Sequence, residues 1–141
     1  LHADNDNPNP AAGGRAKSDH GVFGSPGANV WSDTKVTKTV DKAWDKINNG
    51  EDGVRVDRQD GGRTAYTVPM GKDIGYINER VPDRLPNGEV RRDAAGDVVF
   101  QRDANGAWVR EMQKLDHMKM IVEGKNNVIT AYPDRIRDYD L

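Results

Sequence analysis

The chain has 141 residues, of which 35% are hydrophobic, 31% are charged and none is cysteine. No apolar stretch approaches the roughly 20 residues of a membrane-spanning helix, and the lack of Cys excludes disulfide scaffolds, Cys-ligated zinc and thiol catalysis. With 21 Lys and Arg against 23 Asp and Glu, the chain also lacks the basic excess that is typical of nucleic-acid-binding domains.

The first 17 residues are rich in Asn, Pro, Gly and Asp and carry one large aliphatic side chain, Leu1. Such a segment lacks the apolar surface needed to pack on a core, so we interpret residues 1–17 as a flexible linker or junction. A start at Leu1 rather than Met is what we expect of a piece of a longer protein. Residues 18–141 have the length of one ordinary domain, and we expect them to form one.

A helix is predicted over residues 33–48. Ser32 or Asp33 suits the N-cap, and Asn49-Gly50 suits a left-handed turn at the other end. The apolar residues between them recur at spacings of four, four and three, which is the period of an amphipathic helix: Val36, Val40, Trp44 and Ile47.

From residue 53 the apolar period changes to two, which predicts strands. Gly61-Gly62 marks a turn, and Asn87-Gly88, Ala95-Gly96 and Asn105-Gly106 are hairpin signals. The stretches RRDAAGDV and QRDANGAW resemble each other, but two short copies do not indicate a solenoid. The predicted fold class is α+β, an N-terminal helical region packed on a twisted antiparallel sheet.

The predicted core joins the helix to the strands through apolar side chains of both. The residues expected in it are Val36, Val40, Trp44, Ile47, Val54, Val56, Ile74, Met118, Met120, Val122 and Ile129.

The last two strands carry the clearest chemical pattern. If a loop over residues 123–126 pairs Val122 with Asn127, then Lys119 lies opposite Thr130 and His117 lies opposite Tyr132, with all four side chains on one face. The other face is then apolar. A shift of one residue would destroy this grouping.

That polar group suits metal-free RNA cleavage. A histidine takes or gives a proton near neutral pH, so His117 is a candidate general base or acid. Lys119 offsets the charge that builds on the phosphorane, and the Thr130 and Tyr132 hydroxyls donate hydrogen bonds to its oxygens. The non-catalytic alternative is that these are ordinary residues of an exposed sheet face, since Thr and Tyr favour strands.

The stretch KMIVEGKNNVITAYP resembles the terminal strand pair of the BECR ribonuclease superfamily (barnase, EndoU, colicin and RelE relatives), found at the C-termini of bacterial polymorphic toxins. In those toxins the last strand often reads as apolar residues, Thr, a small residue, an aromatic residue and Pro, as residues 128–133 do here. The stretch VPMGKDIGYI resembles an earlier strand, with Gly71 and Gly75 at the matching turns.

The resemblance implies a ribonuclease toxin that needs no cofactor or metal and cleaves RNA, with tRNA the commonest target among such toxins. It also implies that His20, in KSDHGVFG, pairs with His117 as acid and base, as two histidines do in EndoU-like members. The alternative for His20 is an exposed loop histidine without a catalytic role. The Asn- and Pro-rich leader is similar to that of a toxin domain of a contact-dependent growth inhibition protein (CdiA). Such a domain is delivered from the surface of one bacterium, acts in the cytoplasm of its neighbour, and is neutralised by an immunity protein.

RNA contacts are expected from a few strand and turn cations, because Arg and Lys bind phosphate oxygens. The candidates are Arg63, Lys72, Arg91 and Arg102. A solvated surface is the commoner role of such residues. Because the net charge is −2, tight RNA binding would require a local basic cleft or a helper protein from the target cell.

Two rival functions remain open. The first is a metal-dependent nuclease, because Glu123-Gly124-Lys125 matches part of the PD-(D/E)xK motif and Asp97, Asp103 or Asp116 would supply a second carboxylate. The second is a non-enzymatic binding module of a surface protein. Zinc deaminases and HNH nucleases are excluded by the absence of Cys and the scarcity of His.

Overall fold

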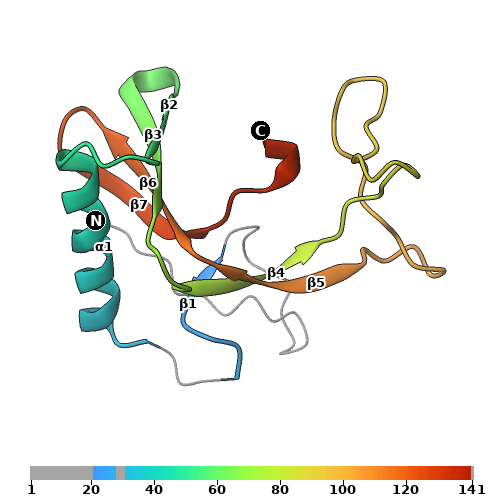
Figure 1. Ribbon diagram of the computed structural model, residues 1–141, viewed down its shortest axis with the longest axis horizontal. Helices are drawn as coiled ribbons and strands as arrows, with labels where there is room; N and C mark the ends of the chain where they lie inside the picture. The colour runs from blue at the N-terminus through green and yellow to red at the C-terminus, as the bar shows by residue number, and fades with distance from the viewer. Residues whose placement is uncertain (1–20, 28–30, 141) are drawn as a thin grey trace. The chain divides into compact units, whose positions relative to one another are not determined.

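The computed structural model describes residues 21–27 and 31–140, and its fold is α+β. Residues 1–17 therefore lie outside the described part of the chain. Figure 1 shows the course of the chain. Its elements are β1 (Val22–Phe23), α1 (Asp33–Asn48), β2 (Arg55–Arg58), the 3-10 turn η2 (Asp60–Gly62), β3 (Arg63–Pro69), β4 (Gly75–Arg80), β5 (Arg110–Leu115), β6 (His117–Glu123), β7 (Asn127–Asp134) and the 3-10 turn η3 (Asp138–Asp140).

Helix α1 confirms the sequence prediction at both ends. The Ser32 hydroxyl accepts a hydrogen bond from the Lys35 N–H at 3.2 Å, which caps the first turn. Gly50, at φ 62°, takes the left-handed conformation that ends the helix. The buried stripe is formed by Val36, Val40 and Ala43.

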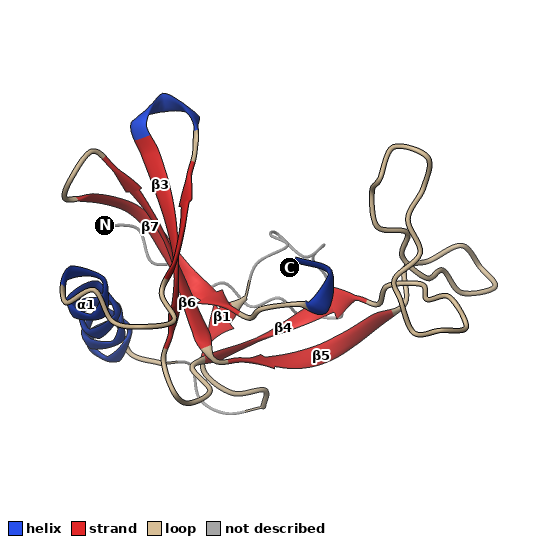
Figure 2. Cartoon of the chain, turned by 45° about the horizontal axis from the view of Figure 1, so that its top comes forward, coloured by secondary structure: helices blue, strands red, loops and turns tan. Residues whose placement is uncertain are grey.

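Four strands form an antiparallel sheet in the order β2-β3-β6-β7. Helix α1 packs along one face of this sheet, as Figures 1 and 2 show. The core between them is built from side chains of both elements, and its sheet residues include Val68, Met118, Met120 and Ala131.

The prediction that Val56 and Ile129 belong to the core is wrong. Val56 is 56% exposed, because β2 is the edge strand of the sheet and all four of its residues are exposed. Val54, just before β2, packs on the core instead. Val128 rather than Ile129 packs on the core from β7, because a register irregularity between Ile121 and Val122 turns the start of β7 over. The other predicted residues lie in the core or against it, or are buried nearby.

A second sheet has the order β1-β4-β5. At two positions in or next to this sheet, neighbouring atoms lie so close to the backbone that only glycine fits. A Cβ atom at Gly75 would meet the backbone carbonyl of Val22 and the ring of Pro133, and one at Gly21 would meet Leu115. Both glycines are therefore fixed by packing rather than by backbone conformation.

The described chain divides into two compact units. We call the residues through Ile77, together with Lys114–Arg135, the sheet unit. We call Asn78–Gln113, together with the residues from Ile136 onward, the hairpin unit. The chain leaves the sheet unit within β4 and returns to it within β5.

The hairpin unit consists of tandem hairpins whose turns are the predicted ones, drawn as tan loops in Figure 2. Each opens on an arginine that is bridged to an apolar residue six positions later: Arg84 to Val90, Arg92 to Val98 and Arg102 to Trp108. The internal resemblance in the sequence identified the second and third hairpins as copies but missed the first. In the first copy, Leu85 replaces the Asp that the other two share.

Backbone hydrogen bonds tie the bases of the hairpins together in two closed rings. In each ring every residue donates its N–H to one member and accepts at its C=O from the other. The bond lengths lie between 2.8 and 3.1 Å. The rings thus supply hydrogen-bond partners for the backbone N–H and C=O groups at the bases of the hairpins, so a large apolar core is not needed to hold these bases together. The first contains Asp83, Val99 and Arg91, and the second contains Val81, Val109 and Gln101.

Candidate active site

The sheet unit has a polar face, on the side of the four-stranded sheet opposite the core. Along β6, Met118, Met120 and Val122 are buried, whereas His117, Lys119 and Ile121 alternate with them and are half-buried. Because successive side chains of a strand point to opposite faces, the second set lies on the face away from α1. This confirms the face that the sequence assigned to His117 and Lys119.

Pairing across the strands brings further polar residues beside this set. Lys119 lies between Thr67 of β3 and Tyr132 of β7. Directly paired residues have their Cβ atoms about 4.5–5.5 Å apart, so these three side chains are immediate neighbours. Arg55 of β2 continues the row beyond Thr67. The row Arg55–Thr67–Lys119–Tyr132 therefore crosses the whole sheet.

His117 begins β6 at one end of the polar face and is paired with Asp134 of β7 and Pro69 of β3. Its Nδ1 atom lies 2.6 Å from Oδ1 of Asp116, the residue that joins β5 to β6. An ionised carboxylate only accepts hydrogen bonds, so Nδ1–H of His117 is the donor. This pairing leaves Nε2 as the ring nitrogen that is available for proton transfer.

The predicted register of the β6–β7 hairpin is wrong by two residues. Lys119 faces Tyr132 instead of Thr130, and His117 faces Asp134 instead of Tyr132. Glu123 pairs with Asn127, so the loop has three residues instead of four, and the irregularity between Ile121 and Val122 adds a second shift. Either shift alone would reverse the faces of β7. Together they restore them, so Thr130 and Tyr132 stay on the polar face.

Thr130 is paired with Ile121, one step along the sheet from the Lys119 row. The four described catalytic candidates, His117, Lys119, Thr130 and Tyr132, therefore share one face. The fifth, His20, lies outside the described residues.

The four candidate RNA-binding cations are divided between the two units. Arg63 pairs with Glu123 at 3.4 Å, and Lys72 is exposed in the turn between β3 and β4. In the hairpin unit, Arg91 pairs with Asp83 at 3.1 Å, and Arg102 stacks on an aromatic ring. Two of the four thus already face a carboxylate.

The carboxylates of the metal-dependent alternative lie in different settings. Glu123 contacts Arg63, and Lys125 follows in the turn after β6. Asp97 and Asp103 belong to the hairpin unit, where Asp103 Oδ1 accepts the N–H groups of Asn105 and Ala107. Among the residues that the structure describes, no three His, Asp or Glu side chains are grouped as metal ligands.

Sequence reasoning missed three residues of the polar face: Arg55, Thr67 and Asp134. Strands were predicted for this part of the chain from its period of two. The neighbours of β6 in the sheet were not predictable, because period-two patterns do not say which strands pair.

Comparisons of the chain with family models, with curated proteins and with solved structures find no match. Within residues 21–27 and 31–140, no helix is long and apolar enough to cross a membrane.

Proposed function

We propose that the chain is a metal-independent endoribonuclease whose active site is the polar face of the sheet unit. The observation that supports this most is the shared face of His117, Lys119, Thr130 and Tyr132, with the Asp116 carboxylate on the ring of His117. A proton-transfer group, a cation and two hydroxyl donors are the parts that phosphodiester transesterification needs.

The reaction proceeds as follows in this proposal. A general base removes the proton of a ribose 2′-hydroxyl, and the 2′ oxygen bonds to the adjacent phosphorus. The bond from phosphorus to the 5′ oxygen breaks, and a general acid protonates that oxygen. The products are a 2′,3′-cyclic phosphate and a 5′-hydroxyl. His117 fills one of the two proton-transfer roles through Nε2 and His20 fills the other.

Lys119 and Tyr132 stand beside each other next to His117, and in the proposal they bind the non-bridging oxygens of the phosphate. Their positive charge and hydroxyl donor favour the phosphorane, which carries more negative charge than the starting diester. Thr130 donates from the neighbouring row. Asp116 acts through His117 by fixing its tautomer, so it is a positioning residue.

The biological setting in this proposal follows the resemblance to CdiA-type toxin domains of the BECR superfamily. The domain would be delivered from a bacterial surface, cleave tRNA in the cytoplasm of a neighbour and be held inactive by an immunity protein. The net charge of −2 supports a requirement for a helper protein in RNA binding.

The test is cleavage of purified tRNA by the full chain in the presence of EDTA. We expect activity to persist, to leave 2′,3′-cyclic phosphate ends and to fall about 10²–10⁴-fold in His117→Ala, the range that general acid–base catalysis contributes. Loss of activity in EDTA would favour the metal-dependent alternative. Folded protein without cleavage, with or without a bacterial extract as helper, would favour a binding module.

A further inference from the structure

The repeated arginines of the hairpin unit make the same contact inside their own hairpins. In each, Nη1 donates to the carbonyl of the turn glycine four residues later. The lengths are 2.8 Å for Arg84, 2.9 Å for Arg92 and 2.8 Å for Arg102. The three guanidinium groups are therefore held alike, and each has a second edge that faces away from its turn.

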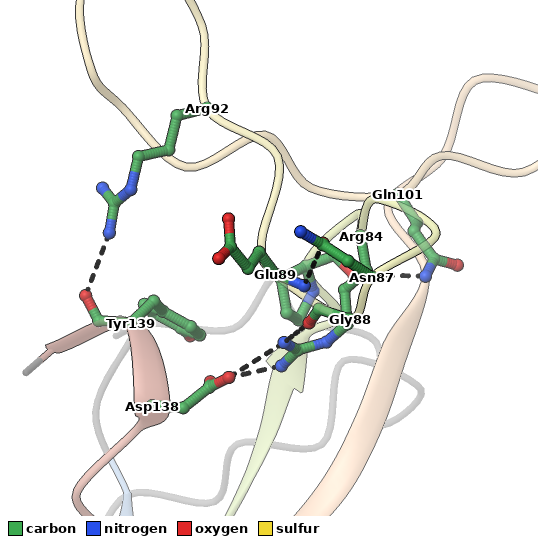
Figure 3. A network of polar contacts seen from close by, with 9 residues as sticks. Arg84, Asn87, Gly88, Glu89, Arg92, Gln101, Asp138 and Tyr139 are labelled. Atoms are coloured by element: carbon green, nitrogen blue, oxygen red, sulfur yellow. Dashed lines mark hydrogen bonds and ion pairs between the residues drawn. The ribbon is translucent and has the colours of Figure 1, made fainter.

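The first two arginines use that second edge to bind the C-terminal segment of the hairpin unit (Figure 3). Arg84 binds the Asp138 carboxylate through Nη1 at 2.9 Å and Nη2 at 3.2 Å, a bidentate contact. Arg92 donates through Nη2 to the Tyr139 carbonyl at 3.2 Å. Oxygen atoms of one short peptide segment thus occupy two of three equivalent positions.

The third hairpin departs from the other two at its Arg and at its closing residue. Trp108 stands where the first two hairpins have Val90 and Val98. The Arg102 guanidinium lies 3.5 Å from the centre of the Trp108 ring. Among the described residues, Arg102 has no hydrogen-bond acceptor besides its own turn glycine. Stacking on an aromatic face leaves the in-plane N–H groups of an arginine free to donate.

A cavity of about 540 Å³ opens beside this arginine. Arg80 reaches it from β4, with its guanidinium 4.2 Å from the Phe100 ring centre. The lining combines both charges with aromatic walls: Arg80, Asp93, Asp97, Val98, Val99, Phe100, Arg102 and Trp108.

We propose that the Arg102–Trp108 cavity binds a carboxylate in an acidic peptide segment of a partner protein, in the way that Arg84 binds Asp138. The chain itself provides the precedent, since its Asp138-Tyr139 segment already occupies the matching positions on Arg84 and Arg92. The mixed lining favours a peptide, because its backbone N–H groups can approach Asp93 and Asp97. RNA is less suited, because it carries a negative charge at every phosphate and has few N–H donors, so Asp93, Asp97 and the acidic excess of the hairpin unit repel it more strongly than a peptide that presents one carboxylate to Arg102. The proposal does not depend on the ribonuclease activity.

The test is an NMR titration of the full ¹⁵N-labelled chain with the amidated, acetylated tetrapeptide Arg-Asp-Tyr-Asp, copied from residues 137–140. We expect saturable shifts of the Trp108 indole N–H and of the amides of residues 102–108. The same peptide with both Asp replaced by Asn is expected to lose these shifts. Hexauridylate, the RNA probe, is expected to leave these signals in place.

Arg102→Gln should abolish the shifts, and the exposed Arg58→Gln in β2 is the matched control that should keep them. Arg102→Lys retains the charge and a donor for the Gly106 carbonyl but loses the fork, so it should bind the peptide several-fold more weakly. Unchanged indole signals of Trp31 and Trp44 would show that the sheet unit stays folded. Shifts that persist in Arg102→Gln, equal shifts with the Asn peptide, no shifts with the Asp peptide, or shifts with hexauridylate alone would each overturn the proposal.

Discussion

The Nδ1 atom of His117 lies 2.6 Å from Oδ1 of Asp116, its neighbour in the chain. We expect Asp116→Asn to lower kcat roughly 10–100-fold, the equivalent of losing a charged hydrogen bond of about 1.5–3 kcal/mol, with little change in KM. The reason is that the amide no longer fixes the proton on Nδ1. Long-range ¹H–¹⁵N spectra of the His117 ring should show a larger share of the Nε2–H tautomer.

The exposed Asp41→Asn in α1, on the other side of the sheet, serves as the control for this change. It removes the same charge from the sheet unit without touching His117. An Asp116→Asn protein with wild-type kcat, or with an unchanged tautomer, would show that the contact has no role in catalysis.

A comparison of variants at Lys119 and Lys125 distinguishes a specific role of one lysine in catalysis from a general attraction of RNA by positive charge. Lys119 is half-buried between Thr67 and Tyr132, whereas Lys125 is exposed in the β6–β7 turn. We expect Lys119→Ala to reduce tRNA cleavage about 10²–10³-fold, as removal of a transition-state donor does, and Lys125→Ala to change it little. Single-turnover cleavage rates measure both. Equal losses would mean that the two lysines only attract RNA.

Met118 and Met112 test the assignment of the core. Met118 is fully buried on the α1 side of the sheet, and Met112 is 47% exposed. Met118→Ala should lower the free energy of unfolding by about 2–5 kcal/mol, because it removes transfer energy and leaves a cavity. Met112→Ala should stay within about 0.5 kcal/mol of the wild type. Urea unfolding followed by circular dichroism compares them, and similar losses would contradict the assignment.

The contact between Arg84 and Asp138 should be lost in acid. A hydrogen bond from Arg84 holds the pKa of the Asp138 carboxyl below its ordinary value and raises the pKa of Arg84. A carboxyl with a lowered folded-state pKa stabilises the fold above its unfolded pKa of about 3.9, and this contribution is lost as the pH falls through the folded value.

The guanidinium N–H signals of Arg84, which contact Asp138 directly, should therefore show a transition below about pH 4 when they are followed from pH 6 downwards. Asp138→Asn should remove that transition, since the amide does not titrate. The exposed Asp52→Asn, in the turn after α1, should leave it in place. Wild-type Arg84 signals that stay unchanged throughout would show that the contact with Asp138 is not broken in acid.

Local signals in the sequence were strong for α1 and for the hairpin turns. The cap at Ser32, the apolar spacing from Val36 to Ile47 and the glycine at position 50 act within one helix, so they predicted its ends correctly. The glycines of the hairpin turns likewise adopt positive φ where Asn-Gly and Ala-Gly pairs predicted turns. Val56 shows the limit, because an edge strand has the same alternation as an inner one.

The sequence by itself determined that His117 shares a face of its strand with Lys119, and that Thr130 shares a face of its strand with Tyr132, because alternation is a local property of each strand. That the two pairs lie on the same side of the sheet depends on the register between β6 and β7. Only the tertiary structure decided which of them meet. A shorter loop and a register irregularity shift β7 by two residues, and pairing with β3 and β2 adds Thr67 and Arg55 to the Lys119 row. The register of β7 and the pairing of the strands depend on packing between distant segments of the chain. The same is true of the contact between Arg84 and Asp138, which are 54 residues apart.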